Sequence, residues 1–270
     1  MLTVIIPTYK PQIYFLDCLM SLEKQTMDRS CFEIIVVLNG ENGPYLSLIH
    51  NYIEKAGLDN VRIIYTEEKG VSNARNIGMD NSKGDFIVFL DDDDFLSSNY
   101  LNDLFQKVSC RQNTIVVSNV KTYSPVTQVE GLDYLSRAFK KSREGYFSVR
   151  HHRSFFSSVC AKIIPVHVID KIRFNTNLSV SEDAVFMFAI SKNIHQVYLS
   201  DKDSIYYRRL TAGSASRRKK DFVSKFKIMW FAIQSYSKVY FSECSSYRFS
   251  FYLNRMSAAI YSFLRSITKI

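Results

Sequence analysis

Four short apolar runs alternate with amphipathic segments over the first 90 residues, and this alternation constrains the fold more than any other feature of the chain. The apolar runs cover residues 2–6, 32–38, 61–65 and 86–90. Apolar side chains recur at helical spacing between them, in residues 11–25, 45–56 and 71–81. Strands that are apolar throughout are buried on both faces, as in parallel sheets, and right-handed crossovers place helices on both sides. The sequence therefore predicts an α/β fold with a Rossmann-like, mostly parallel, doubly wound sheet.

The loops that follow these strands are where ligands are expected. In doubly wound sheets, ligands bind at the edge formed by the carboxyl ends of the strands. The four loops contain residues 7–9 (Pro-Thr-Tyr), 39–40 (Asn-Gly), 66–68 (Thr-Glu-Glu) and 91–94 (four Asp). We therefore look for the chemistry of the protein in these loops.

The pattern loosens after residue 123. We expect strands at residues 115–117 and 159–164, and a final strand region, Ser-Ile-Tyr-Tyr-Arg-Arg, within residues 197–209. Helices are expected at residues 131–139 and 181–191. The second helix is expected to begin with Ser181 as its cap. Residues 142–157 are polar, basic and aromatic, which predicts a long loop. Apolar residues recur every three or four positions in residues 222–240 and 249–267, which predicts two C-terminal amphipathic helices.

The excess positive charge lies entirely in the C-terminal segment. Residues 1–216 carry 24 basic and 24 acidic side chains, whereas residues 217–270 carry 11 basic and two acidic ones, giving the chain its net charge of +9. Such a segment indicates either an anionic surface or partner, or simply a solvated helix face. Its aromatic stripes are typical of helices that pack on the preceding domain and of helices that lie on anionic lipid. Both interpretations stay open.

Cysteine usage and hydropathy exclude several classes of protein. The five cysteines, at positions 18, 31, 110, 160 and 244, form no CxxC pair, which argues for free thiols and against a zinc site. No stretch approaches the roughly 18 to 20 apolar residues of a membrane-spanning helix. The N-terminal residues resemble a strand and not a signal peptide. We therefore expect a cytoplasmic protein.

Residues 91–94 are the strongest chemical signal. Four carboxylates directly after a buried strand repel one another unless a cation neutralises them. Carboxylate oxygens suit Mg²⁺ or Mn²⁺, and Mg²⁺ is typically held by one or two carboxylates together with substrate phosphates. The alternative is a solvated acidic loop.

Two weaker signals lie elsewhere. Residues 70–78 open a helix with small side chains, which attracts anions, and Arg75 adds a fixed positive charge. A capped helix with one surface arginine would give the same pattern. Glu182 and Asp183 begin a later helix and include a candidate general base, although acids at a helix start are also common for dipole reasons alone.

Taken together, these motifs resemble the family-2 glycosyltransferases, which have the GT-A fold. The resemblance covers about residues 1–216 and rests on four motifs in order, at residues 4–9, 70–78, 89–94 and 181–183. It implies an inverting glycosyltransferase that moves a sugar from a nucleotide-diphosphate donor to a hydroxyl of a saccharide or lipid-linked saccharide, in surface polysaccharide synthesis.

The resemblance also implies roles for individual residues. Pro7, Thr8 and Tyr9 should line the nucleotide base pocket, and Arg75 should contact the nucleotide. In the DXD element, Asp91 and Asp92 should lie near the ribose and the metal, and Asp93 should bind Mn²⁺ or Mg²⁺.

On the acceptor side, Asp183 should act as the base, with Glu182 orienting it or the acceptor. Arg208, Arg209 and residues 214–216 should approach the diphosphate. Asn39 stands where the family usually has an Asp that reads the base, and it can donate as well as accept. UDP is the commonest donor nucleotide in the family, but this substitution leaves other nucleotides open.

The resemblance divides the chain into a catalytic domain, residues 1–216, and a basic helical tail, residues 217–270. Within the domain, residues 1–120 would bind the nucleotide-sugar and residues 121–216 the acceptor. Peripheral contact with the inner face of the cell membrane is expected, and nucleic acid is not an expected partner. The alternatives are a metal-dependent phosphohydrolase that uses the Asp run, and a non-catalytic protein whose tail binds nucleic acid or membrane.

Overall fold

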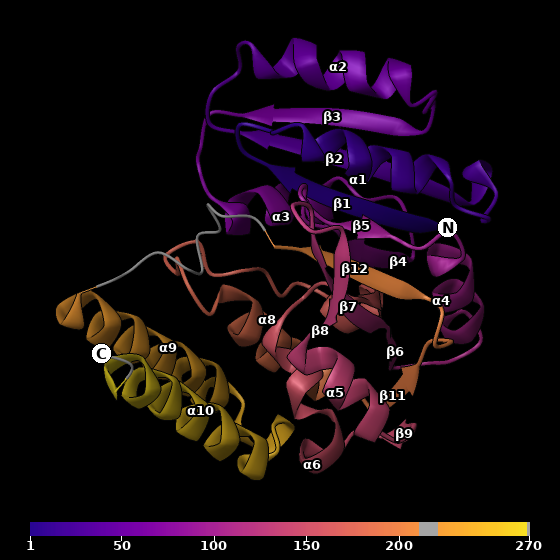
Figure 1. Ribbon diagram of the computed structural model, residues 1–270. Helices are drawn as coiled ribbons and strands as arrows, with labels where there is room; N and C mark the ends of the chain where they lie inside the picture. The colour runs from indigo at the N-terminus through magenta and orange to yellow at the C-terminus, as the bar shows by residue number, and fades with distance from the viewer. Residues whose placement is uncertain (211–220, 269–270) are drawn as a thin grey trace.

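The computed structural model describes residues 1–210 and 221–268, and its central element there is an eight-stranded sheet (Figure 1). In spatial order the strands are β3 (Val61–Thr66), β2 (Phe32–Asn39), β1 (Leu2–Thr8), β4 (Phe86–Phe89), β10 (Lys162–Pro165), β6 (Thr114–Val117), β11 (Gln196–Leu199) and β9 (Gly145–Tyr146). Within this sheet, β10 and β9 run opposite to the other strands. The predicted α/β fold with a mostly parallel sheet is confirmed.

Helices cover both faces of the sheet at its N-terminal half. The residues of β2 alternate between these faces: Ile34 joins the large core that includes α1 (Tyr14–Glu23) and α2 (Tyr45–Lys55), whereas Ile35 packs with Ala74 of α3 (Val71–Asp80). Gly78 lets α3 approach β1 closely, because a Cβ atom there would lie 2.4 Å from Ile5 Cγ2. The apolar runs therefore form strands since both of their faces are buried.

A second, four-stranded sheet lies beside the first and was not predicted. It consists of β5 (Phe95–Leu96), β12 (Ile205–Arg209), β7 (Asn119–Ser124) and β8 (Val129–Leu132). The final strand region expected within residues 197–209 is β12, whereas β11, which ends at Leu199, belongs to the eight-stranded sheet. The remaining described elements are η1 (Arg29–Cys31), α4 (Tyr100–Val108), α7 (Val166–Ile169), α8 (Glu182–Ile190), η3 (Ser191–Asn193) and η5 (Cys244–Ser246).

Two further expectations for the middle of the chain need correction. The helix expected at residues 131–139 is α5 (Tyr134–Lys141), because Gly131 and Leu132 pair in β8 and Asp133 caps the helix. The long loop expected at residues 142–157 contains β9, α6 (Val149–His152) and η2 (Arg153–Ser157). Its three phenylalanines, Phe147, Phe155 and Phe156, are buried core residues, whereas Tyr146 is exposed.

The tail forms two antiparallel helices, α9 (Phe222–Ser242) and α10 (Phe249–Thr268), at one side of the molecule (Figure 1). One side of this pair packs on the rest of the protein: Phe188 of α8 contacts Tyr236 and Phe251, with ring centroids 5.5 and 5.4 Å apart. The buried Arg255 guanidinium donates to the backbone oxygens of Arg153 and Phe156. The expected boundary between residues 216 and 217 lies outside the described residues. Within the described ranges, no helix has the length and apolarity needed to cross a membrane.

We predict that Phe251→Ala lowers the free energy of unfolding by about 3–5 kcal/mol, because it removes a buried ring from the contact between α8 and α10. Urea denaturation measures this loss. The matched change Leu253→Ala, on the exposed side of the same helix, should cost less than about 1 kcal/mol. Equal losses in the two variants would contradict the packing described above.

Candidate active site

The ends of β1 and β4 bring two of the predicted motifs together. These strands are neighbours, so the loop after Thr8 lies beside the aspartates that follow Phe89. The buried Thr8 hydroxyl donates to Asp92 Oδ2 at 2.5 Å. Burial, together with the charges of Asp93 and Asp91, raises the pKa of Asp92 to about 7. The two predicted binding motifs therefore form one polar cluster at the carboxyl edge of the sheet.

Asn39 joins this edge to the loop before α3. Its amide nitrogen donates to Thr8 O at 2.7 Å, and its amide oxygen accepts from Gly70 N at 3.0 Å. The side chain is buried. An aspartate could accept the second bond but could not donate the first. Asn39 therefore links the end of β1 to the loop before α3 through hydrogen bonds at both ends of its amide.

Tyr9 presents an exposed aromatic ring at the same edge. Its side chain is 45% exposed, and its ring lies against Gly40, where a Cβ atom would come within 2.8 Å of Tyr9 Cε2. Gly40 has a positive φ of 97°, which also favours glycine. The ammonium groups of Lys10 and Lys69 lie 5.6 and 5.7 Å from the ring centroid. A flat ring flanked by cations suits the stacking of a base and the attraction of phosphate.

The Arg75 guanidinium connects the Asp run to the second predicted carboxylate motif. It donates to Asp183 Oδ1 at 2.6 Å and to Asp91 Oδ1 at 2.9 Å. The Arg75 side chain is only 4% exposed, and although burial opposes its charge, Asp183 and Asp91 raise its pKa further above its usual value. It also lies over the Phe174 ring, 5.4 Å from the centroid. Asp91 and Asp183, distant in sequence, thus lie within reach of one side chain.

Asp183 is held at the start of α8 by two partners. Besides Arg75, it accepts from Val159 N through Oδ2 at 3.1 Å. A carboxylate has roughly four acceptor positions, so this arrangement leaves room for a further hydrogen bond. Glu182 lies beside it, and burial, followed by the charge of Asp183, raises the pKa of Glu182. Ser181 occupies the cap position, but its side chain makes no capping bond, because its backbone is left-handed with a φ of 69°.

The end of the Asp run is fixed by β12. Buried Asp94 accepts from Arg209 N at 2.7 Å, and burial and the neighbouring Asp91 and Asp93 raise its pKa well above its usual range. Tyr206 Oη accepts from Asp91 N at 3.2 Å. Arg209 Nε donates to the backbone oxygen of Asp93 at 2.8 Å. The last strand of the second sheet therefore holds the turn that carries the four carboxylates.

The carboxylate oxygens of this turn are suitable ligands for a hard divalent cation. Asp91 and Asp93 provide carboxylate oxygens, and the Asp91 side chain is 40% exposed. Within the described residues, no group of three or more His, Cys, Asp or Glu side chains is placed to hold a metal ion. Mg²⁺ commonly takes one or two carboxylates and completes its coordination with substrate phosphates and water. The residues present fit that mode of binding, which depends on a phosphate-bearing ligand.

The two predicted arginines of β12 point in different directions, as successive strand residues do. The Arg209 guanidinium pairs with Asp17 at 2.9 Å and lies 4.5 Å from the centroid of the Tyr14 ring. Arg208 pairs instead with Asp133 at 2.7 Å. Arg209 therefore contacts the Asp turn, while Arg208 contacts the cap of α5. The predicted residues 214–216 lie outside the described residues.

Lys162 is a buried residue near the site that the sequence did not reveal. It is 1% exposed, and its ammonium group donates to Ser158 O at 2.5 Å and to Cys160 O at 2.6 Å. These carbonyls flank Val159, whose N–H binds Asp183. Burial lowers the pKa of Lys162 to about 8. A lysine inside an otherwise apolar strand run was the available signal.

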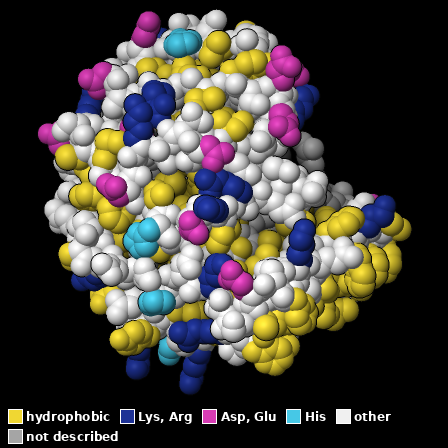
Figure 2. All heavy atoms as spheres, turned by 180° about the vertical axis from the view of Figure 1, so that it is seen from behind, with side chains coloured by type: hydrophobic (Ala, Val, Ile, Leu, Met, Phe, Trp, Pro, Cys, Tyr) yellow, Lys and Arg dark blue, Asp and Glu magenta, His cyan; other side chains and the backbone are white. Residues whose placement is uncertain are grey.

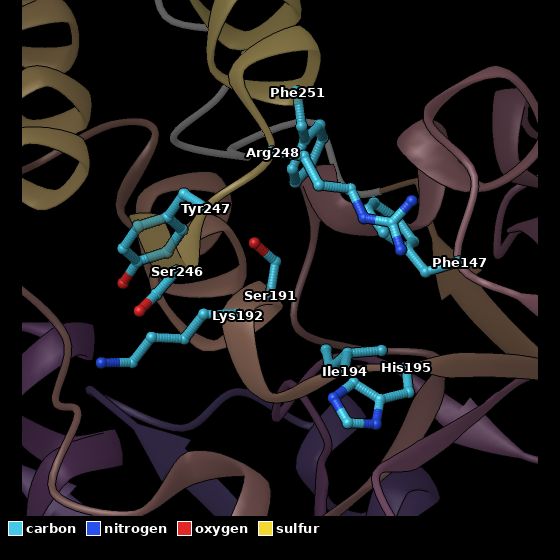
Figure 3. Close-up of a pocket in the computed structure, with 9 residues that line it drawn as sticks. All are labelled: Phe147, Ser191, Lys192, Ile194, His195, Ser246, Tyr247, Arg248 and Phe251. Carbon is cyan, nitrogen blue, oxygen red and sulfur yellow. The ribbon is translucent and has the colours of Figure 1, made fainter. Parts of the chain in front are cut away.

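Among the cavities formed by the described residues, three lie outside the carboxylate cluster, one of them, of about 330 Å³, between α2 and β3. A second, of about 190 Å³, lies between η3 and the turn joining α9 and α10 (Figure 3). Its cations already have partners: Lys192 pairs with Glu243 at 2.5 Å, and Arg248 lies over the ring of Phe147, which also lines the cavity. The third, of about 340 Å³, borders Arg209, Asp17 and Tyr123, and so lies beside the Asp turn. The carboxylate chemistry is therefore centred on the edge of the sheet.

Comparison with known proteins supports one interpretation of this edge. Residues 3–172 match the model of the family described as Glycosyl transferase family 2. Glycosyltransferase GlyA of Streptococcus pneumoniae is 27% identical over 80% of this chain and 31% of its own length. The poly(ribitol-phosphate) beta-N-acetylglucosaminyltransferase TarS of Staphylococcus aureus is 24% identical over 76% of this chain and 35% of its own. The chain thus spans about a third of the length of these relatives.

Solved structures show the same fold. Residues 1–349 of TarS in complex with UDP-GlcNAc align with a TM-score of 0.70 and 19% identity, covering 98% of this chain and 81% of that one. The complex of the same TarS fragment with UDP gives a TM-score of 0.67 and 20% identity, over 87% of this chain and 65% of that one. At this identity the likeness establishes the architecture.

The lowered pKa of Lys162 predicts a specific pH dependence of stability. Its folded-state pKa of about 8 lies below the usual 10.5, so the unfolded chain binds more protons between these values. Stability should therefore rise with pH across this window, by up to about 1.4 kcal/mol per pH unit relative to a Lys162→Met variant. Urea denaturation of both proteins from pH 7 to pH 10.5 measures the difference. A difference that stays constant with pH would contradict a lysine destabilised by burial.

Proposed function

This chain belongs to glycosyl transferase family 2, and on that premise we propose that it transfers a sugar from a nucleotide-diphosphate donor to a hydroxyl group of an acceptor. The observation that carries this proposal is that Arg75 forms two ion pairs, with Asp91 at 2.9 Å and with Asp183 at 2.6 Å. A donor-binding carboxylate and a candidate base are thereby held next to each other. Family membership favours this activity over the phosphohydrolase and nucleic-acid alternatives.

In the proposed mechanism, the acceptor hydroxyl attacks the anomeric carbon in a single displacement with inversion. Asp183, oriented by Arg75 and Val159 N, takes the proton of that hydroxyl as the new bond forms. A divalent cation bound at Asp93, with Asp91 and Asp92 beside it, would neutralise charge on the departing diphosphate. Glu182 orients the base or the acceptor. The preorganised carboxylates and Arg75 need no rearrangement to do this.

We propose a UDP-sugar as the donor. The TarS structures that share this fold contain UDP and UDP-GlcNAc, which supports the choice for this chain. Tyr9 would stack on the base, and Pro7 and Thr8 would line its pocket. Asn39 would act indirectly, because both ends of its amide already bind Thr8 and Gly70.

We propose a saccharide or lipid-linked saccharide as the acceptor, in the synthesis of a surface polysaccharide. The names of relatives support this: TarS modifies poly(ribitol-phosphate), and GgaB of Bacillus subtilis is a minor teichoic acid biosynthesis protein. A cytoplasmic location at the inner face of the membrane would bring the site to such acceptors.

Two matched variants test the base. Asp183→Asn should lower the rate of sugar transfer by about 10² to 10⁴-fold, because general-base catalysis is lost, while leaving UDP binding nearly unchanged, because the proposed donor-binding residues are kept. Glu182→Gln should have a smaller effect. Transfer rates and thermal unfolding are measured for both, since Asp183→Asn also weakens the pair with Arg75. If Glu182→Gln has the larger effect on transfer, Glu182 is the base; if neither lowers transfer, the mechanism is wrong.

A nucleotide panel tests the donor site. UDP, GDP, CDP and dTDP are each added with and without Mn²⁺, and thermal unfolding is followed. A nucleotide at about a hundred times its Kd should add about 2.7 kcal/mol of stability. We expect UDP to stabilise most, and only with the metal. Asp93→Ala should abolish this shift, whereas Asp203→Ala, at an exposed aspartate outside the site, should keep it. No shift with any nucleotide would contradict the proposed donor site.

A further inference from the structure

The tail helices expose a large apolar surface that the proposed chemistry does not use. On α9, the aromatic residues Phe222, Phe226, Trp230 and Phe241 are 44% to 70% exposed. On α10, Phe249, Leu253, Ile260 and Leu264 are 44% to 57% exposed. Figure 2 shows hydrophobic side chains gathered along the protruding pair of helices α9 and α10, at the lower right of the view. We refer to these eight residues as the apolar face of the tail.

Helical geometry places the eight residues on one side of the pair. Leu253, Ile260 and Leu264 follow Phe249 at spacings of four, seven and four, which keeps them on one side of α10. Phe222, Phe226 and Trp230 are spaced by four on α9. Because the helices are antiparallel and contact each other through Phe263 and Tyr252, both stripes turn to the same side. The residues that pack on α8 and η2, such as Phe251 and Arg255, lie on the opposite side.

The charged side chains of the two helices all have the same sign. Neither α9 nor α10 contains Asp or Glu. Lys227, Lys238 and Arg265 are exposed, and their helical positions place them at the edge of the stripes. Glu243, in the turn between the helices, pairs with Lys192 at 2.5 Å. Asp221, the exposed N-cap residue directly before Phe222, accepts from Ser224 N. Apart from these two acids at the ends of α9, the described charges beside the apolar face are positive.

We propose that the apolar face of the tail docks on the surface of a membrane that contains anionic lipid. Aromatic and aliphatic side chains of a surface helix enter the boundary between headgroups and acyl chains, while Lys and Arg at its edge contact anionic headgroups. Trp230 is suited to that boundary, because an indole has an apolar body and a polar N–H. The face lies parallel to the bilayer, and its helices do not span it.

Charge favours a membrane over a second copy of the chain. A symmetric dimer through this face would bring Lys227, Lys238 and Arg265 of each copy toward the same positive edge of the other, without acids on either helix to neutralise them. An anionic bilayer supplies the missing negative charge. The proposal rests on the tail alone and does not depend on the identity of the donor or the acceptor.

The single tryptophan of the chain provides a direct test, since Trp230 lies in the apolar face. The full-length protein is mixed with vesicles of phosphatidylcholine alone, or of phosphatidylcholine with an equal amount of phosphatidylglycerol. We expect the protein to float with the anionic vesicles and its Trp emission to shift to the blue as the indole leaves water. Raised salt should weaken binding, because exposed charges are screened. Unchanged emission with the protein left in solution would overturn the proposal.

Three variants separate the contributions. Leu253→Gln combined with Ile260→Gln should abolish the blue shift while keeping every charge. Reversing Lys227, Lys238 and Arg265 to Glu should lower the vesicle partition coefficient by more than about a hundredfold, since each cation near an anionic leaflet contributes about fivefold. Reversing Lys55, Lys83 and Lys171, which are exposed elsewhere, changes net charge equally and should leave binding intact.

Cooperative thermal unfolding should persist in the first two variants. Its loss would show that a variant is misfolded, in which case Phe222→Ser combined with Phe241→Ser replaces that variant. Concentration-dependent burial of Trp230 without vesicles, with a dimer seen by light scattering, would overturn the proposal in favour of a second copy. Equal binding by the tail-reversed and control-reversed proteins would also overturn it.

Discussion

The buried guanidinium of Arg75 is the interaction on which the candidate site depends, because it bridges carboxylates from two distant parts of the chain. A buried cation costs several kcal/mol unless its partners are present, and each partner is costly without the cation. Arg75 can lie under the site because Gly78 allows α3 to press against β1. The close packing of one helix thus fixes Asp91 after β4 and Asp183 at α8 relative to each other.

The sequence predicted the elements whose burial is uniform along the chain. Strands β1, β2 and β4 appeared as apolar runs because both faces of the central sheet are covered there, whereas the edge strand β3 is only half-buried. The second sheet could not be predicted in that way, because β5 has two residues and β12 is not an apolar run, since two tyrosines and two arginines follow Ile205. These strands form through pairing between residues about a hundred positions apart, such as Tyr206 with Leu96. Local periodicity carries no information about such partners.

The same limit applies to the site. Residue type and position, after a strand for Asp91 and near a helix start for Arg75 and Asp183, identified these three residues, and the structure brings them together. Sequence could not say that Arg75 is occupied by two carboxylates instead of facing solvent. Lys162 was missed because its role depends on the carbonyls of Ser158 and Cys160, which any residues would supply. The roles assigned to Asp93, Asp183 and Tyr9 remain predictions until the variants are measured.

The tail illustrates how one apolar pattern can serve two surfaces. The stripe of α9 is wide enough for Tyr236 to be buried against α8 while Phe226 and Trp230 face water. Hydrophobic spacing alone could not separate these sides, because both contribute to the same repeat. Removing apolar surface from water contributes roughly 25 cal/mol per Å², and the exposed aromatic rings do not gain this free energy. The helix pair is anchored on α8 through one side and is apolar on the other, so covering the apolar side with a second surface lowers its free energy. Packing on α8 leaves this side exposed, and the proposed docking follows from that arrangement.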